Sequence, residues 1–263
     1  SLRKLLDMEY RDPNLVRLYL GQIAEERKQT DEAIKWFSSV EAGEQYAAAQ
    51  VRIANLLARQ GRIDEARRSL QGAAANSSRD RVQFLLTEAQ IMRDAGQAQE
   101  AFDLVSSQLT SQPDQPDLLY ESALLAERLG RMDVLETNLR RLIGLKPDHA
   151  HAYNALGYSL ADRGERLDEA QALVAKALEI SPDDPFILDS MGWVLFKRGD
   201  ANGALAPLQR AYGIRQDPEI AAHLGEVLWA LGKREDAQKL LREAASANPQ
   251  NEVLANAIKK LIP

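Results

Sequence analysis

The chain has 263 residues, of which 45% are hydrophobic and 27% charged, so its composition is that of a folded protein rather than a disordered one. A formal net charge of −6 without any basic block argues against nucleic-acid binding, which needs clustered Lys and Arg opposite the phosphates. The sequence contains no cysteine, which excludes disulfides and thiolate chemistry, and no apolar run of the roughly 18 residues that a membrane-spanning helix needs.

The N-terminal residues 1–10 carry an apolar rhythm that starts without a helix cap. This pattern predicts the remainder of an earlier helix in a longer protein, with any targeting segment further upstream. An uncovered helix end of this kind leaves apolar area available, so we also expect that the ends could support a homodimer.

Glycines recur along the rest of the chain about every 34 residues, at Gly61, Gly96, Gly130, Gly164, Gly199 and Gly232. An alanine follows most of them by five residues, whereas six separate Gly164 from Ala170. In the first period Lys28 stands in the place of the glycine. A fixed period of this length is typical of a solenoid, in which each unit buries its apolar face against its neighbours.

Each period contains the signals of two helices. In one of them, Asp184 predicts the cap of a first helix over residues 186–198, and Asp200 predicts the cap of a second helix over residues 201–213. The next unit begins in the same way at Asp217. The pattern predicts seven units that begin near Asn14, Ala47, Val82, Pro116, Ala150, Pro185 and Pro218. Asn251 predicts the cap of a final helix over residues 252–262, which would cover the end of the stack.

Residues inside these units resemble the tetratricopeptide repeat, a helix-turn-helix unit of 34 residues. The pairs that match its Leu-Gly position are Leu20-Gly21, Leu156-Gly157, Met191-Gly192 and Leu224-Gly225, and the residues at its aromatic position are Phe37, Leu208 and Leu241. The resemblance implies an all-α, right-handed solenoid of about seven repeats with a partial N-terminal helix and a C-terminal capping helix. It also implies a single domain over residues 1–263 that acts as a non-catalytic protein-interaction scaffold.

The geometry of that family implies that the outward stripe of each first helix lines a concave groove. The aromatic residues on this stripe are Tyr120, Tyr158, Phe186, Trp193, Phe196 and Trp229. The charged residues that share it are Arg52, Arg59, Arg93, Arg128, Lys197, Asp94, Glu121, Glu127, Asp162 and Asp189. We therefore predict a peptide- or helix-binding groove centred on Trp193, Phe196 and Trp229. The alternatives are that the rings pack between first helices as core and that the charges form a solvated surface.

The run of residues 146–212 also resembles the large repeat lipoproteins of Gram-negative outer membranes, a group that includes the adaptor of a periplasmic carboxy-terminal processing protease. That resemblance implies an adaptor that presents cell-wall (peptidoglycan) hydrolases to the protease. It further implies a periplasmic location with a lipid anchor on an upstream segment, with the cytoplasm as the alternative compartment. A structural assembly factor of the envelope and the regulatory repeat region of a larger enzyme remain alternative functions.

The three histidines do not form a pattern of enzymatic chemistry. His149 and His151 flank a helix start on different faces without a third ligand, so we expect surface histidines. His223 lies beside Glu219 and Glu226, which favours a local ion pair or groove contact over general-base catalysis. We therefore expect no enzyme, no metal site and no cofactor.

Overall fold

The computed structural model describes residues 12–77 and 79–262, and this part of the chain contains fifteen helices and no strand. The all-α prediction is therefore confirmed. The predicted helix remnant over residues 1–10 lies outside the described residues.

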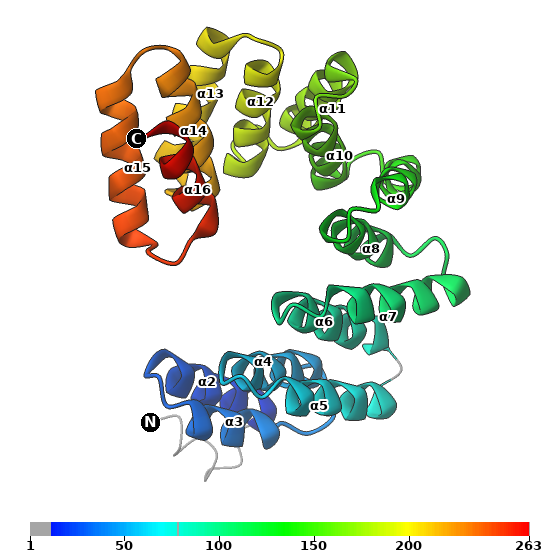
Figure 1. The fold of residues 1–263 in the computed structure, drawn as a ribbon. Helices are drawn as coiled ribbons and strands as arrows, with labels where there is room; N and C mark the ends of the chain where they lie inside the picture. The colour runs from blue at the N-terminus through cyan, green and yellow to red at the C-terminus, as the bar shows by residue number, and fades with distance from the viewer. Residues whose placement is uncertain (1–11, 78, 263) are drawn as a thin grey trace. The chain divides into compact units, whose positions relative to one another are not determined.

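The helices follow one another as pairs, each a first helix and a second helix joined by a short turn (Figure 1). The first helices are α2 (Pro13–Glu26), α4 (Tyr46–Arg59), α6 (Arg81–Asp94), α8 (Pro116–Arg128), α10 (Ala150–Asp162), α12 (Pro185–Lys197) and α14 (Pro218–Ala230). The second helices are α3 (Thr30–Ser38), α5 (Ile63–Asn76), α7 (Ala98–Ser111), α9 (Met132–Leu145), α11 (Leu167–Ile180), α13 (Ala201–Ile214) and α15 (Arg234–Ala247). A last helix, α16 (Glu252–Leu261), follows the seventh pair. Each first helix begins within one residue of the unit start that the sequence predicts.

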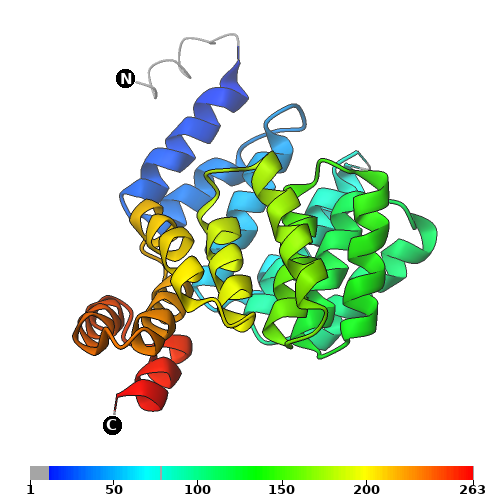
Figure 2. The same ribbon diagram turned by 90° about the horizontal axis from the view of Figure 1, so that it is seen from above.

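The contacts divide the chain into two compact units, of which unit 1 ends at Leu135 and unit 2 begins at Glu136. Within unit 1, each first helix from α2 to α6 packs on its own second helix, and that second helix packs on the next first helix. Unit 2 repeats the arrangement from α10 to α15, and there α16 packs on both α14 and α15 (Figures 1 and 2). A single continuous domain over the whole chain stays a prediction.

The turn inside each pair depends on a left-handed residue just after the first helix. The glycines of the periodic series have φ values between 68° and 88°, where a side chain is strained. Lys28, at the position that lacks the glycine, adopts the same conformation with a φ of 58°. The longer spacing after Gly164 is also explained, because Arg166 takes a second left-handed conformation (φ 43°) directly before α11.

Glycines in the first helices allow the two helices of a pair to approach closely. A Cβ atom on Gly21 would lie 2.4 Å from Phe37, and one on Gly192 would lie 2.4 Å from Leu208. The two other Leu-Gly matches behave alike, since a Cβ on Gly157 would meet Val174 and one on Gly225 would meet Leu241. In these four pairs, the glycine of the repeat pattern therefore lies directly against a side chain of the second helix.

The predicted caps are confirmed. The side chains of Asp184, Asp200 and Asp217 accept hydrogen bonds from backbone N–H groups in the first turns of α12, α13 and α14. Asn251 does the same for α16, which runs to Leu261 rather than to residue 262. These side chains satisfy N–H groups that have no partner within the helix, so each helix start is fixed locally.

Candidate functional site

Neighbouring first helices of unit 1 form three pockets that follow one another. The pocket between α2 and α4 is lined by Gln22, Glu25, Glu26, Arg52 and Arg59. The pocket between α4 and α6, next to the start of α5, is lined by Asn55, Ala58, Arg59, Ile63, Gln90, Ile91, Asp94 and Ala95. The pocket between α6 and α8 is lined by Val82, Gln83, Leu86, Thr87, Gln90, Gln115, Asp117, Tyr120 and Glu121. Because Arg59 and Gln90 are each shared by two pockets, the three form a continuous surface, which we call the unit 1 groove.

Ion pairs organise the charges of the unit 1 groove. Arg52 and Arg59 on α4 both donate to the carboxylate of Glu25 on α2, at 2.8 and 3.0 Å. On the next helices, Arg93 donates to Glu121 at 2.6 Å. The guanidinium of Arg128, in turn, donates to the backbone carbonyl of Arg93 at 3.2 Å.

Glu121 is an acid of the groove whose pKa is shifted by its surroundings. Its side chain is 12% exposed, and this burial raises its pKa above the ordinary value even though Arg93 and Arg128 act in the opposite direction. Asp94 contributes to the rise as a nearby like charge. The cations around Glu121 thus compensate only part of the cost of burying its carboxylate.

In unit 2, the first helices bring together a cluster around Trp193, which we call the Trp193 cluster. The imidazole of His223 on α14 stacks on the indole of Trp193 on α12, with 4.1 Å between ring centroids. The ring of Tyr158 on α10 lies 6.0 Å from that of His223, and Phe196 lies 5.6 Å from Trp193. The cluster therefore spans three successive first helices.

Polar contacts fix the orientation of Trp193. Its indole N–H donates to a carboxylate oxygen of Asp162 at 3.1 Å, and the ammonium of Lys197 lies 5.0 Å from the ring centroid. The same ammonium donates to the backbone carbonyl of Asp162 at 3.0 Å. Trp193 is consequently held from both its edge and its face.

His223 of the Trp193 cluster forms a buried pair with Asp189. Nδ1 of His223 lies 3.0 Å from each carboxylate oxygen of Asp189, and both side chains are about nine-tenths buried. The sequence favoured either a local ion pair, with Glu219 and Glu226 as the neighbouring acids, or a groove contact; the acid that pairs with His223 is instead Asp189. The partner comes from the preceding first helix, while Glu226 pairs with Lys260 at 2.9 Å.

The predicted aromatic residues differ in how much surface they offer. Trp193 is only 6% exposed, which favours the alternative that its ring packs between first helices. Phe186 is 40% exposed and lies under the guanidinium of Arg215. The remaining four, Tyr120, Tyr158, Phe196 and Trp229, are half-buried. A role of these rings in partner binding stays a prediction, as does that of Arg93, Arg128 and Lys197, which contact groups of this chain.

Several pairs join residues that are one repeat period apart, a regularity that the sequence analysis missed. Glu25 and Arg59, Asp189 and His223, and Glu226 and Lys260 are each separated by 34 positions, and Asp162 and Lys197 by 35. Residues one period apart occupy equivalent places on adjacent first helices, or on α14 and the last helix α16. Pairs of oppositely charged residues separated by one period are the sequence signal from which these contacts could have been predicted.

The other histidines lie near helix starts, as expected. His149 caps α10, because its Nδ1 accepts a hydrogen bond from the backbone N–H of Ala152, and His151 lies 3.7 Å from Asp184. Within residues 12–77 and 79–262, no group of three or more His, Asp or Glu side chains is placed to hold a metal ion. The same residues include no helix that is both long enough and apolar enough to cross a membrane.

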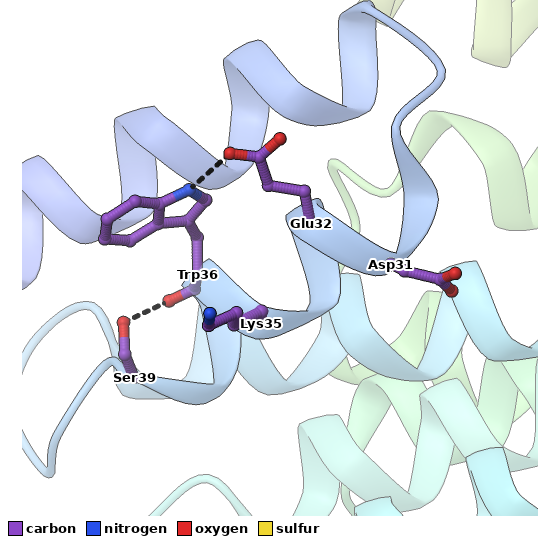
Figure 3. A pocket seen from close by; sticks show the side chains of 5 residues that line it. All are labelled: Asp31, Glu32, Lys35, Trp36 and Ser39. Atoms are coloured by element: carbon purple, nitrogen blue, oxygen red, sulfur yellow. Dashed lines mark hydrogen bonds between the residues drawn. The ribbon is translucent and has the colours of Figure 1, made fainter.

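A further pocket lies on α3 (Figure 3). Its lining consists of Asp31, Glu32, Lys35, Trp36 and Ser39. The indole N–H of Trp36 faces Glu32 at 3.5 Å, and Ser39 donates to the Trp36 carbonyl at 2.6 Å (Figure 3). All of these residues belong to one helix and its C-cap, so the described residues supply only one wall.

Two family models with the description tetratricopeptide repeat match this chain, one over residues 51–116 and 136–185 and the other over residues 195–261. The chain is 40% identical over 238 residues to the TPR repeat-containing protein PA4667 of Pseudomonas aeruginosa. That match covers 90% of this chain and 35% of the relative, so the chain spans about a third of the length of the curated relative.

Solved structures show the same fold. A tetratricopeptide repeat protein from Parabacteroides merdae matches 95% of this chain and 99% of its own, with a TM-score of 0.72 and 16% identity. The thermophilic TPR protein TTC0263 of Thermus thermophilus matches 67% of this chain and 98% of its own, with a TM-score of 0.61 and 23% identity.

Proposed function

Because the chain belongs to the tetratricopeptide-repeat family, whose repeat is a protein-interaction scaffold, we propose that this segment binds a protein partner along the exposed side of its first helices. The observation that carries the proposal is the unit 1 groove, in which three pockets follow one another between α2, α4, α6 and α8. A succession of pockets at the spacing of the repeats suits an elongated ligand such as a peptide segment. Mixed charges along the groove would set the orientation of the partner more than its affinity.

In its finer form, the proposal is that the segment belongs to an adaptor which binds a periplasmic carboxy-terminal processing protease and presents cell-wall hydrolases to it. The support is the resemblance of residues 146–212 to outer-membrane repeat lipoproteins. The chain also spans only about a third of the length of PA4667, so a longer protein of that kind has further surface for a second partner. An envelope location with a lipid anchor outside this segment belongs to the same proposal.

A reconstituted degradation assay tests the proposal. The full-length protein, or this segment, is mixed with the purified protease and a peptidoglycan hydrolase, and hydrolase cleavage is followed with each component left out in turn. We expect cleavage to accelerate only when all three are present. Binding of either partner without any change in cleavage would instead favour a structural assembly factor, and recovery of neither protein by affinity capture from an envelope extract would refute the proposal.

A groove-blocking variant locates the binding surface. Gln90 is exposed and lines two of the three pockets, so Gln90→Trp should obstruct the unit 1 groove and abolish the acceleration. The matched control is Ser107→Trp, an equally large change at an exposed position on the second helix α7. If both variants behave as the unsubstituted protein does, the partner binds elsewhere.

A further inference from the structure

We propose that the pocket between α6 and α8 receives a basic side chain, Lys or Arg, from an extended segment of the partner. This inference rests on the proposed function and adds the chemistry that the unit 1 groove recognises. It concerns unit 1 alone, and not the aromatic residues of unit 2 that the sequence analysis favoured.

The lining of this pocket suits a long side chain that ends in a positive charge. Its charged residues are Asp117, which is exposed, and Glu121, and among the described residues that line the pocket none is basic. Val82 and Leu86 supply apolar surface for the alkyl stem of a Lys or Arg, and Tyr120 also lines the pocket. Carboxylates for the head and apolar surface for the stem are thus present in one pocket.

The electrostatics of Glu121 explain why the pocket would gain from another cation. Arg93 already contacts this carboxylate at 2.6 Å, yet burial raises its pKa, so the negative charge is incompletely compensated. Asp117 accepts a hydrogen bond from the side-chain amide of Gln115 at 3.4 Å, which provides no charge. A partner ammonium or guanidinium would supply the missing positive charge to both acids.

The opposite end of the groove has a different charge pattern, which directs a basic side chain to α6 and α8. Two guanidinium groups, those of Arg52 and Arg59, converge on the single carboxylate of Glu25 between α2 and α4. Glu26 also lines that pocket, so its two acids and two bases balance in charge. Among the described residues, the pocket between α6 and α8 is lined by two acids and no basic residue, so it is the one that attracts a basic residue of a bound segment.

A set of three peptides tests the chemistry. The probes are a capped heptapeptide of serine and glutamine with one central lysine, and its two variants with glutamine or glutamate in the central position. Titration into the ¹⁵N-labelled whole chain, followed by NMR, should shift amide signals of residues 82–90 and 115–121 with the lysine peptide. We expect the glutamine peptide to bind about tenfold more weakly, a difference of ~1.4 kcal/mol, and the glutamate peptide more weakly still. Equal binding of the lysine and glutamine peptides, shifts confined to unit 2, or no binding at all would overturn the proposal.

Charge-removing variants test the two acids. The double variant Asp117→Asn/Glu121→Gln should bind the lysine peptide about tenfold more weakly than the unsubstituted chain does. The control is Glu219→Gln, since Glu219 is an exposed first-turn acid on α14 in unit 2, as Asp117 is on α8. If the double variant does not fold, the single variant Asp117→Asn is tested instead. It should bind the lysine peptide about threefold more weakly, because Asp117 is at an exposed site. Unchanged binding by the folded variants contradicts the proposal.

The outcome is separable from that of the proposed function. If the variants lose lysine-peptide binding but still capture the protease, the pocket binds a basic side chain but is not part of the surface that binds the protease. Persistent hydrolase degradation together with equal binding of all three peptides would refute the basic-residue pocket and leave the adaptor function standing.

Discussion

Replacing Gly192 with alanine should destabilise unit 2, although alanine favours a helix more than glycine does. An added Cβ would lie 2.4 Å from Cγ of Leu208 and 3.1 Å from the backbone carbonyl oxygen of Ala204. The first contact is far below van der Waals distance, and the second involves the backbone of α13, which cannot turn aside as a side chain can. α12 and α13 must therefore separate, or Leu208 must leave its rotamer.

The magnitude follows from two opposing effects. Overpacking of a filled core costs about 1–3 kcal/mol. Replacing glycine by alanine also makes the unfolded chain less flexible, which stabilises the folded state by about 0.4–1 kcal/mol. We expect a net loss of about 1–2 kcal/mol for Gly192→Ala. The matched control is Gly213→Ala in α13, where nothing lies within 4 Å of the added atom, so only the gain applies.

Urea unfolding is followed by tryptophan fluorescence in a Trp36→Phe background, where the remaining tryptophans, Trp193 and Trp229, both report on unit 2. The midpoint should fall for Gly192→Ala and rise for Gly213→Ala. Leu208→Ala removes the clash, so it should cost less in the Gly192→Ala background than alone, with a coupling of about 0.5–3 kcal/mol. A raised midpoint for Gly192→Ala, or strict additivity with Leu208→Ala, would refute the close-packing argument.

Three further changes test other parts of the chain. Lys28→Gly should stabilise unit 1 by about 1 kcal/mol, because Lys28 has a left-handed backbone conformation in which a Cβ atom is strained. Thermal denaturation measures the effect, and an unchanged midpoint would show that no strain is present. Hydrogen bonds from Arg166 lower the pKa of Glu136 to about 2. The Glu136 carboxylate therefore stabilises the folded state fully above its ordinary pKa of 4.5, and this stabilisation is lost as the pH falls through about 2. Glu136→Gln should therefore cost about 1 kcal/mol at pH 7, since the pair is partly solvent-screened, and almost nothing near pH 2, and parallel stability curves would contradict this. For Asp189 and His223, a double-alanine cycle monitored by urea unfolding should give a coupling of about 1–3 kcal/mol, and a value near zero would show that the buried pair contributes no specific interaction.

The helix pairs could be predicted because their ends depend on local chemistry. Asp184 and Asp200 cap their helices through backbone groups only a few residues away, and Gly199 needs nothing beyond its own conformational freedom. The turn after Gly164 marks the limit of this reasoning. Its longer spacing predicted an extra residue, but which residue absorbs it depends on how α10 and α11 pack, and the structure assigns the left-handed conformation to Arg166.

The candidate site could be predicted less completely. How deeply a side chain is buried depends on packing between repeats, whereas the helical stripe gives only the face of the helix on which the side chain lies. The stripe predicted that Trp193 faces the groove, but it could not show that His223 from α14 stacks on its ring. Burial of Trp193 results from contacts between repeats, whereas Phe186 on the same helix stays 40% exposed. A hydrophobic pattern within one repeat carries no information on the side chain that the next repeat places above it.

Pairs one period apart do carry such information, and they separate structural charges from those available to a partner. Within one helix, side chains three or four residues apart in the sequence can contact each other. Between equivalent places on adjacent first helices, the contacting side chains are instead one repeat apart in the sequence. Glu226 and Lys260 follow this rule in unit 2, as Glu25 and Arg59 do in unit 1. A charge engaged at this spacing already has its counterion within the chain, so a partner must displace that counterion before it can bind there. Asp117 is exposed and hydrogen-bonded to a neutral amide, so it can accept a cation without breaking such a pair. Specificity in this chain should therefore lie at charges outside the periodic pairs, of which Asp117 in the pocket between α6 and α8 is one in unit 1.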